Sequence, residues 1–173
     1  MTPKEIFQKI YNENNCELYT NSFKVNGEVG ANIHITKYNL KVFYHENIID
    51  AFYDFGNSDT ALITINLPLP IPFPDFQLIT IDHITKLFFF RKRNWHLKCR
   101  NRSLKNKIET LLRKHTFVNL MENTAFEPTI TGIKSEFSYK ISTRFSLDYS
   151  DNVTSISSIL DFHKELIDLI KEK

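Results

Sequence analysis

Alternating hydrophobic and polar residues predict several β-strands in this chain of 173 residues. The clearest alternation runs from Phe137 to Tyr149, where one face of the predicted strand is apolar apart from Thr143. Stretches with the same period occur at 31–35, 38–44, 61–67, 76–81 and 95–99. Weaker strand signals lie near Leu18 and Tyr19 and at 130–133, where we expect Gly132 to form a bend or bulge.

Three segments instead show the spacing of amphipathic helices. The first begins with Thr2, Pro3 and Glu5, the residues of a capping box with proline at the first helical position. The second is expected to start at an N-cap Ser103. The third begins near 151–155 and places His163 on its apolar side, where we expect a hydrogen-bonded core or boundary histidine. Its other side carries Asp161, Lys164, Glu165, Asp168, Lys171 and Glu172, which predicts a solvated face.

Four prolines alternate with other residues between the predicted strands 61–67 and 76–81: Pro68, Pro70, Pro72 and Pro74. Because proline has no backbone N–H, this segment cannot be a central strand. We expect an edge strand or an extended structural strap. A hairpin turn is expected at Asn26-Gly27, whose residue types tolerate positive φ.

The order of these elements is a helix, several strands, a basic helix, long strands and a final helix. Hairpin-length connections and half-polar strands favour an antiparallel sheet. We therefore predict a single α+β domain over residues 1–173, with a mainly antiparallel sheet of about five to seven strands. The N-terminal, central basic and C-terminal helices are expected to pack largely on one face of that sheet.

Composition and the ends of the chain favour an ordinary soluble protein. Hydrophobic residues make up 42% and charged residues 24% of the sequence, as in globular domains. No apolar run resembles a secretory leader or is long enough to span a membrane. Cys16 and Cys99 lack a CxxC partner, which is typical of reduced packing residues. We expect a cytoplasmic protein, and its many Asn, Ile, Lys and Phe residues suggest a bacterial source.

Most familiar catalytic chemistry is missing from the sequence. Only four glycines occur, and none forms a phosphate-binding loop or a nucleophile elbow, so neither a nucleotide cofactor nor a serine-hydrolase site is expected. The six histidines are scattered without metal-ligand spacing. Asp82-His83 could orient an imidazole, but such a dipeptide is common by chance. We predict no catalytic residues, no metal and no cofactor.

Charge is distributed very unevenly along the chain. Eleven cations and one acid, Glu109, give the segment 86–114 a formal charge of +10, so the whole-chain charge of +2 leaves −8 elsewhere. Candidate contacts to an anionic partner are Arg91, Lys92, Arg93, Lys98, Arg100, Arg102, Lys105 and Lys107. Trp95 is expected to point inward from the strand 95–99, while Phe88, Phe89 and Phe90 are candidates for contact with a membrane surface.

These observations leave several functional hypotheses open. The first is a non-enzymatic domain that binds another macromolecule, a protein or a further copy of itself. The alternative is a binder of nucleic acid or of an anionic membrane surface through segment 86–114. A third is an enzyme whose site is assembled from residues distant in sequence. A basic segment is also a common way to keep a protein soluble.

Overall fold

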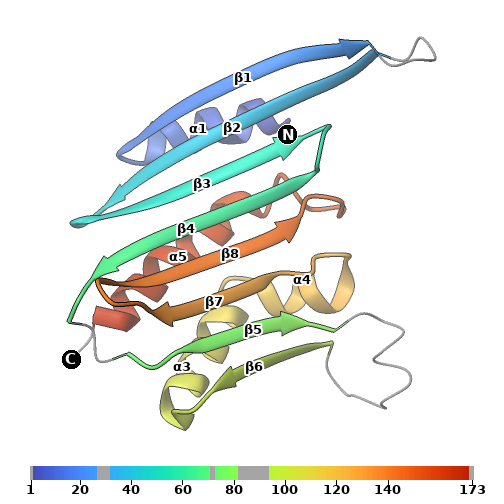
Figure 1. The fold of residues 1–173 in the computed structure, drawn as a ribbon. Helices are drawn as coiled ribbons and strands as arrows, with labels where there is room; N and C mark the ends of the chain where they lie inside the picture. The colour runs from blue at the N-terminus through green and yellow to red at the C-terminus, as the bar shows by residue number, and fades with distance from the viewer. Residues whose placement is uncertain (1, 27–31, 71–72, 82–93, 172–173) are drawn as a thin grey trace.

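The computed structural model describes residues 2–26, 32–70, 73–81 and 94–171. Eight strands lie in this part of the chain: β1 (Cys16–Asn26), β2 (Asn32–Tyr44), β3 (Asn47–Phe55), β4 (Thr60–Pro68), β5 (Phe76–Thr80), β6 (Trp95–Cys99), β7 (Thr129–Lys134) and β8 (Ser138–Ser146). They form one sheet in the order β1-β2-β3-β4-β8-β7-β5-β6, and every neighbouring pair is antiparallel (Figure 1). The predicted α+β class with an antiparallel sheet is confirmed.

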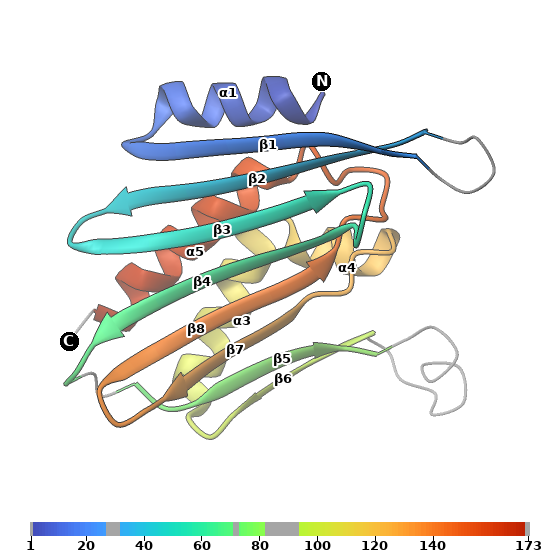
Figure 2. The ribbon, with the colours of Figure 1, turned by 45° about the horizontal axis from the view of Figure 1, so that its top comes forward.

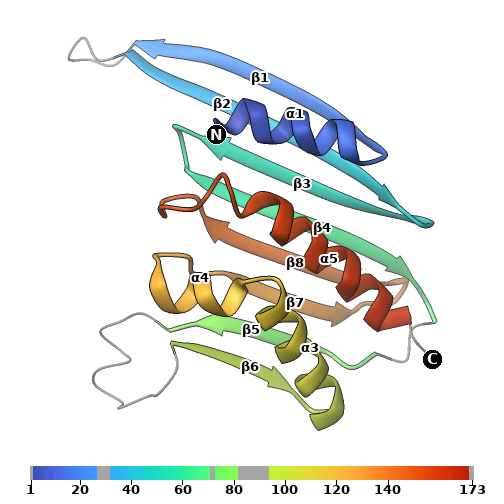
Figure 3. The same ribbon diagram turned by 180° about the vertical axis from the view of Figure 1, so that it is seen from behind.

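Four helices occur among the described residues: α1 (Pro3–Glu13), α3 (Arg102–Lys114), α4 (Phe117–Asn123) and α5 (Ile156–Lys171). Figure 3 shows all four in front of the sheet, whereas in Figure 1 they lie behind it. Their buried side chains join those of the sheet in one continuous core. The opposite face of the sheet is left uncovered by these helices. Helix α4 was not predicted from the sequence.

The sheet has eight strands rather than the predicted five to seven. Strand β3 was missed because apolar residues occur on both of its faces, which hides the period of two. Ile49 and Tyr53 are fully buried beneath the helices, while Ile48 remains 43% exposed on the uncovered face. A further difference is that residues 32–35 and 38–44, from two stretches expected to be separate, belong to a single strand, β2.

The apolar side of β2 changes along its length. Tyr38 and Leu40 point into the helix-covered core, whereas Ile33 and Ile35 occupy odd positions on the opposite face, where Ile33 is 48% exposed and Ile35 is buried. The β1–β2 ladder extends beyond the end of β3, because Phe55 is paired with Thr36 (Figure 2). The apolar side chains of β2 therefore change from one face to the other where β1 and β2 project past the rest of the sheet. Asn26, the first residue of the predicted Asn26-Gly27 turn, is the last residue of β1, and Gly27 lies outside the described residues.

Strand β8 is shorter than the predicted span Phe137 to Tyr149. It runs from Ser138 to Ser146, and Phe137 precedes it with 81% of its surface exposed, so the expectation that Phe137 points inward is wrong. Tyr149 is buried, but it lies beyond the strand in the connection to α5. The Phe137 ring is exposed because it lies in the turn before β8. In this turn the backbone N–H and the hydroxyl of Ser135 both donate to Ser138 O.

Gly132 is not a bulge. The β5–β7 and β7–β8 ladders continue in register through it, with Phe76 on one side and Ile141 on the other. A Cβ atom at this position would lie 2.2 Å from Phe76 Cε1 and 2.5 Å from Tyr139 Oη. Glycine is required here because two aromatic side chains occupy the space where a side chain would be.

The proline-rich segment connects β4 to β5, which are separated in the sheet by β8 and β7. Pro68 ends β4, the Leu69–Pro70 peptide bond is cis, and residues 71–72 are outside the described part. Phe73 is buried against Phe76 and Tyr139. These contacts fit the expected structural strap.

The N-terminal and C-terminal helices agree with their predictions. Thr2 and Glu5 form the capping box of α1, with Thr2 N donating to the Glu5 carboxylate at 2.7 Å and Glu5 N donating to the Thr2 hydroxyl at 3.3 Å. The hydrogen bond from Thr2 is the largest cause that lowers the pKa of Glu5. Helix α5 buries the predicted apolar stripe, including Ile159, Leu166 and Ile170.

Helix α3 begins at Arg102 with Asn101 as its N-cap, so the predicted N-cap, Ser103, lies inside the helix. Asn101 Oδ1 accepts a hydrogen bond from Leu104 N at 3.0 Å. Both residue types make good caps, so the sequence alone could not choose between them. The residue at which α3 begins determines which of its side chains face β6.

We expect Asn101→Ala to lower the free energy of unfolding by about 1 kcal/mol, because it leaves the N–H of Leu104 without its cap. Ser103→Ala is the matched control and should change stability by less than about 0.5 kcal/mol, since Ser103 is an exposed residue inside the helix. Urea denaturation of both variants followed by circular dichroism measures the difference. A larger loss for Ser103→Ala would show that the cap is misassigned.

Candidate functional site

The eight basic residues singled out in the sequence fall into two groups. Arg91, Lys92 and Arg93 lie outside the described residues, as do the candidate membrane contacts Phe88, Phe89 and Phe90. The remaining five are placed on β6, on α3 and in the short connection between them: Lys98, Arg100, Arg102, Lys105 and Lys107.

Lys98, Arg100 and Lys105 line a single groove of about 620 Å³. The groove lies at the β6 edge of the sheet, where α3 packs beside β6 (Figure 3). Its other lining residues are Asp75, Phe76, Gln77, His96, Leu97, Cys99, Thr131 and Ile133. The structure therefore brings together three of the predicted cations with polar and apolar groups from β5 and β7. We call this site the basic groove.

Strand alternation determines what faces the basic groove. On β6, Trp95 and Leu97 are buried in the core, so His96 and Lys98 point to the uncovered face as predicted. Gln77 on β5 occupies the same face, because it is paired directly with Lys98. On the other side, Gln77 is paired with Thr131 of β7. Three neighbouring strands thus contribute one row of polar side chains.

The cations of the basic groove have no carboxylate partner within the described part of the chain. Lys98 and Arg100 are exposed, Lys105 is half-buried, and none of the three forms an ion pair there. Of the residues that the structure describes, Asp75 is the only acid lining the groove, and its Oδ1 accepts a hydrogen bond from Lys134 N at 2.8 Å. Among the described residues, three cations and one carboxylate therefore line the groove.

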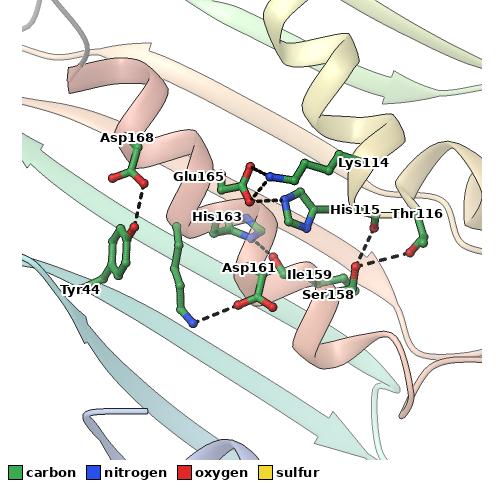
Figure 4. A network of polar contacts seen from close by, with 11 residues as sticks. Tyr44, Lys114, His115, Thr116, Ser158, Ile159, Asp161, His163, Glu165 and Asp168 are labelled. Atoms are coloured by element: carbon green, nitrogen blue, oxygen red, sulfur yellow. Dashed lines mark hydrogen bonds and ion pairs between the residues drawn. The ribbon is translucent and has the colours of Figure 1, made fainter. Parts of the chain in front are cut away.

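Not every cation of segment 86–114 contributes to this surface. Lys114, at the far end of α3, donates two hydrogen bonds to the Glu165 carboxylate on α5, both at 2.7 Å (Figure 4). The Lys114 bond is the largest cause that lowers the pKa of Glu165, while burial of the carboxyl opposes it. Lys114 therefore joins α3 to α5 and is part of the structural framework.

The sequence predicted that the acidic side of α5 is solvated, but several of its carboxylates contact other side chains. Asp168 accepts a hydrogen bond from the Tyr44 hydroxyl at 2.7 Å, and this bond is the largest cause that raises the pKa of Tyr44 to about 12. Asp161 lies 3.0 Å from Lys164 Nζ. Glu165 also lies 3.2 Å from His115 Nε2 (Figure 4). Asp168 and Glu165 thus connect α5 to β2 and α3, whereas Asp161 pairs within α5. The spacing of residues on one helix could not reveal the contacts to other elements.

His163 is a buried, hydrogen-bonded histidine, in agreement with the expectation from the sequence. Its Nδ1 lies 2.7 Å from Ile159 O, a carbonyl that can only accept, so Nδ1 carries the proton. Nε2 then accepts from the Thr143 hydroxyl at 2.7 Å. Thr143 interrupts the apolar face of β8, and its hydroxyl gives the buried His163 ring a hydrogen-bond donor. Both side chains are 0% exposed, so the hydroxyl–imidazole pair has no access to a substrate.

Proteins that bind single-stranded nucleic acid commonly combine cations with aromatic rings that stack on the bases. Trp95 is 4% exposed and Phe76 is 3% exposed, so both rings face the core. Within the described ranges no exposed Phe, Tyr or Trp lines the basic groove, and His96 is the exposed ring there. The groove instead offers cations beside the apolar side chain of Ile133, which is 51% exposed.

Among the described residues, no three or more His, Cys, Asp and Glu side chains are grouped so that they could hold a metal ion. Cys16 and Cys99 are free thiols on strands at opposite edges of the sheet. None of the helices described is both long and apolar enough to cross a membrane. His96 and Cys99 occupy positions of opposite parity on β6, which does not favour a thiol–imidazole pair.

Sequence reasoning missed the part of the groove formed by Asp75, Gln77, Thr131 and Ile133. Gln77 and Thr131 are separated by more than fifty residues and meet only because β5 inserts between β6 and β7. The alternation in 76–81 was a signal that Gln77 points away from the core. The partners of β5 in the sheet had no comparable local signal.

Comparisons with protein-family models, with curated proteins and with solved structures gave no match to this chain. The function proposed below therefore rests on the geometry of the basic groove.

Proposed function

We propose that this protein is a non-enzymatic binding module that holds an acidic segment of another protein in the basic groove. The observation that supports this function best is the convergence of Lys98, Arg100 and Lys105 on one groove of about 620 Å³. None of these side chains has a carboxylate partner among the described residues. We expect the module to act as a single domain in the cytoplasm.

The groove offers a distinct interaction for each part of an acidic peptide. The Arg100 guanidinium can donate two parallel hydrogen bonds to one carboxylate, whereas the Lys98 and Lys105 ammonium groups act as point charges. Gln77 and Thr131 present polar side chains suited to the peptide backbone, and Ile133 provides apolar contact. Uncompensated positive charge would also steer an acidic partner toward the groove during encounter.

An acidic protein segment fits this surface better than nucleic acid does. Electrostatic contact to phosphates would use the same cations, but the rings of Trp95 and Phe76 are buried and unsuited to stacking on bases. A membrane surface would need the aromatic contacts Phe88, Phe89 and Phe90, which lie outside the described residues. Nucleic acid and anionic lipid therefore become outcomes that the binding experiment must separate from an acidic peptide.

Charge reversal in the groove is expected to abolish most of the binding. A labelled poly-glutamate peptide serves as the probe, and its fluorescence anisotropy reports binding to the full chain. We expect Lys98→Glu with Lys105→Glu to weaken binding about tenfold or more, because two attractions become repulsions. Added salt should weaken binding to the unaltered protein as well, since these charges are reached by solvent.

The matched control is Lys4→Glu with Lys9→Glu, which changes the net charge equally on helix α1, far from the groove. Its affinity for poly-glutamate should stay within about twofold of the unaltered protein. Equal losses in both double variants, or no binding of the peptide at all, would refute the proposal. Binding of oligothymidylate or of phosphatidylserine vesicles in place of the peptide would assign the groove to nucleic acid or to a membrane.

A further inference from the structure

Strand β1 is a long and open sheet edge. It has eleven residues, from Cys16 to Asn26, and is the outermost strand of the sheet. In the described part of the chain it pairs with β2 alone, so its outer backbone N–H and C=O groups have no strand partner. Figure 1 and Figure 3 show α1 on the helix-covered face of β1 and β2 and not beyond the edge. A further strand could therefore add to β1.

The usual features that protect a sheet edge are absent from β1. Soluble proteins keep edge strands short or interrupt them with proline, bulges or several charges, because an open edge pairs with other strands. The β1 ladder runs without a bulge, and the strand contains no proline or glycine and only two charged residues, Glu17 and Lys24. The other edge, β6, has five residues and carries Lys98 among the cations of the basic groove.

From this edge we infer that two copies of the chain associate through their β1 strands, antiparallel about a two-fold axis at Asn21. Asn21 is the central residue of β1, so this register pairs all eleven positions of the strand. Such a ladder would add about ten backbone hydrogen bonds. The two sheets would continue into one, and neither copy would keep a long open edge.

The uncovered face of β1 is complementary to itself in this register. Tyr19 of each copy falls opposite Phe23 of the other, which gives two aromatic cross-strand pairs. In the single chain these rings are 59% and 40% exposed. Glu17 falls opposite Val25, another exposed apolar residue of the same strand, and Asn21 falls opposite itself. The exposed apolar residues of β1 thus gain partners.

The side chains on the helix-covered face of β1 also form compatible cross-strand pairs in this register. Thr20 falls opposite Ser22, whose hydroxyls can hydrogen-bond across the ladder, and Leu18 falls opposite Lys24. No two like charges are directly opposed in this register. Pairing centred further along the strand, at Lys24, would place two lysines against each other, and pairing centred at Glu17 would do the same with two carboxylates. The charges therefore disfavour the registers centred on Lys24 and Glu17, and the register centred on Asn21 is the one that pairs all eleven residues of β1.

Analytical ultracentrifugation of the full chain should give a species of twice the 20.4 kDa monomer mass. Asn21→Lys should convert it to a monomer, because two ammonium groups then meet at the axis, and Asn21→Glu should do so through two carboxylates. Asn21 is exposed, so both variants should keep the far-ultraviolet circular dichroism of the unaltered protein. An equimolar mixture of the two variants should restore the dimer, since unlike charges then face each other.

The matched control is Asn66→Glu, which adds the same charge as Asn21→Glu at an exposed asparagine inside the sheet, opposite Lys140, and should leave the dimer intact. A protein that stays monomeric at the highest concentration reached would overturn the inference. So would a dimer that persists in Asn21→Lys, or one dispersed by Lys98→Glu with Lys105→Glu. The last result would point to head-to-tail contact between the basic groove and acidic surface. Poly-glutamate binding does not involve Asn21 and tests the proposed function separately.

Discussion

Gly132→Ala is expected to lower the free energy of unfolding by about 2 to 3 kcal/mol. The added methyl group would overlap Phe76 and Tyr139, because its carbon would lie only 2.2 Å from Phe76 Cε1 and 2.5 Å from Tyr139 Oη. Neither ring can move aside easily. Phe73 packs edge-on against both, and the Tyr139 hydroxyl donates a hydrogen bond to Pro74 O at 2.9 Å. Chemical denaturation of the variant measures the loss.

The sign of this effect separates it from the ordinary behaviour of glycine in a strand. Without the overlap, alanine would stabilise the strand by about 0.5 to 1 kcal/mol, because it restricts the unfolded chain. Thr131→Ala, at the neighbouring position of β7, is the control and should cost less than about 1 kcal/mol. Adding Phe76→Leu to Gly132→Ala should recover part of the loss, since it removes the closest atoms. A stability equal to that of the unaltered protein would show that the rings yield freely.

Local sequence patterns were sufficient to predict the elements that have one face in the core and the other in solvent. The final helix was predicted from its stripe of Ile and Leu, and β6 from the alternation that buries Trp95 and exposes Lys98. These patterns are informative because one face meets the core and the other meets solvent. Strand β3 has no such contrast, since Ile48 and Ile49 point to opposite faces, and it was missed.

Pairing between distant strands had no local signal. Gly132 was interpreted as a bulge because its two aromatic neighbours, Phe76 and Tyr139, come from other strands of the sheet. The basic segment could be recognised from the local sequence. The groove could not, because residues of other strands complete it. Lys98, Arg100 and Lys105 are close in sequence, but Gln77 and Thr131 join them only through the strand order β6-β5-β7.

Lowering the pH from about 7.5 to about 5 is expected to remove about 2 kcal/mol of stability through His163 alone. Burial, which takes the charged ring out of water, is the largest cause that lowers the pKa of His163 from 6.5 to about 4. The bond to Ile159 O opposes the decrease, and the nearby His115 adds to it. Over this interval the unfolded chain gains a proton at position 163, whereas the folded chain keeps the ring neutral. Stability therefore falls as the pH decreases from 6.5 and stops falling, for this residue, below about 4.

Replacing both members of the buried pair isolates this contribution. His163→Leu with Thr143→Val removes the ring and the hydroxyl together, so neither side chain leaves a polar atom unsatisfied. We expect the double variant to be within about 1 kcal/mol of the unaltered protein at pH 7.5 and to lose about 2 kcal/mol less on going to pH 5. Urea denaturation at the two pH values gives both quantities. Equal losses in the two proteins would mean that His163 becomes protonated in the folded state, and the assignment of a neutral ring accepting from Thr143 would be wrong.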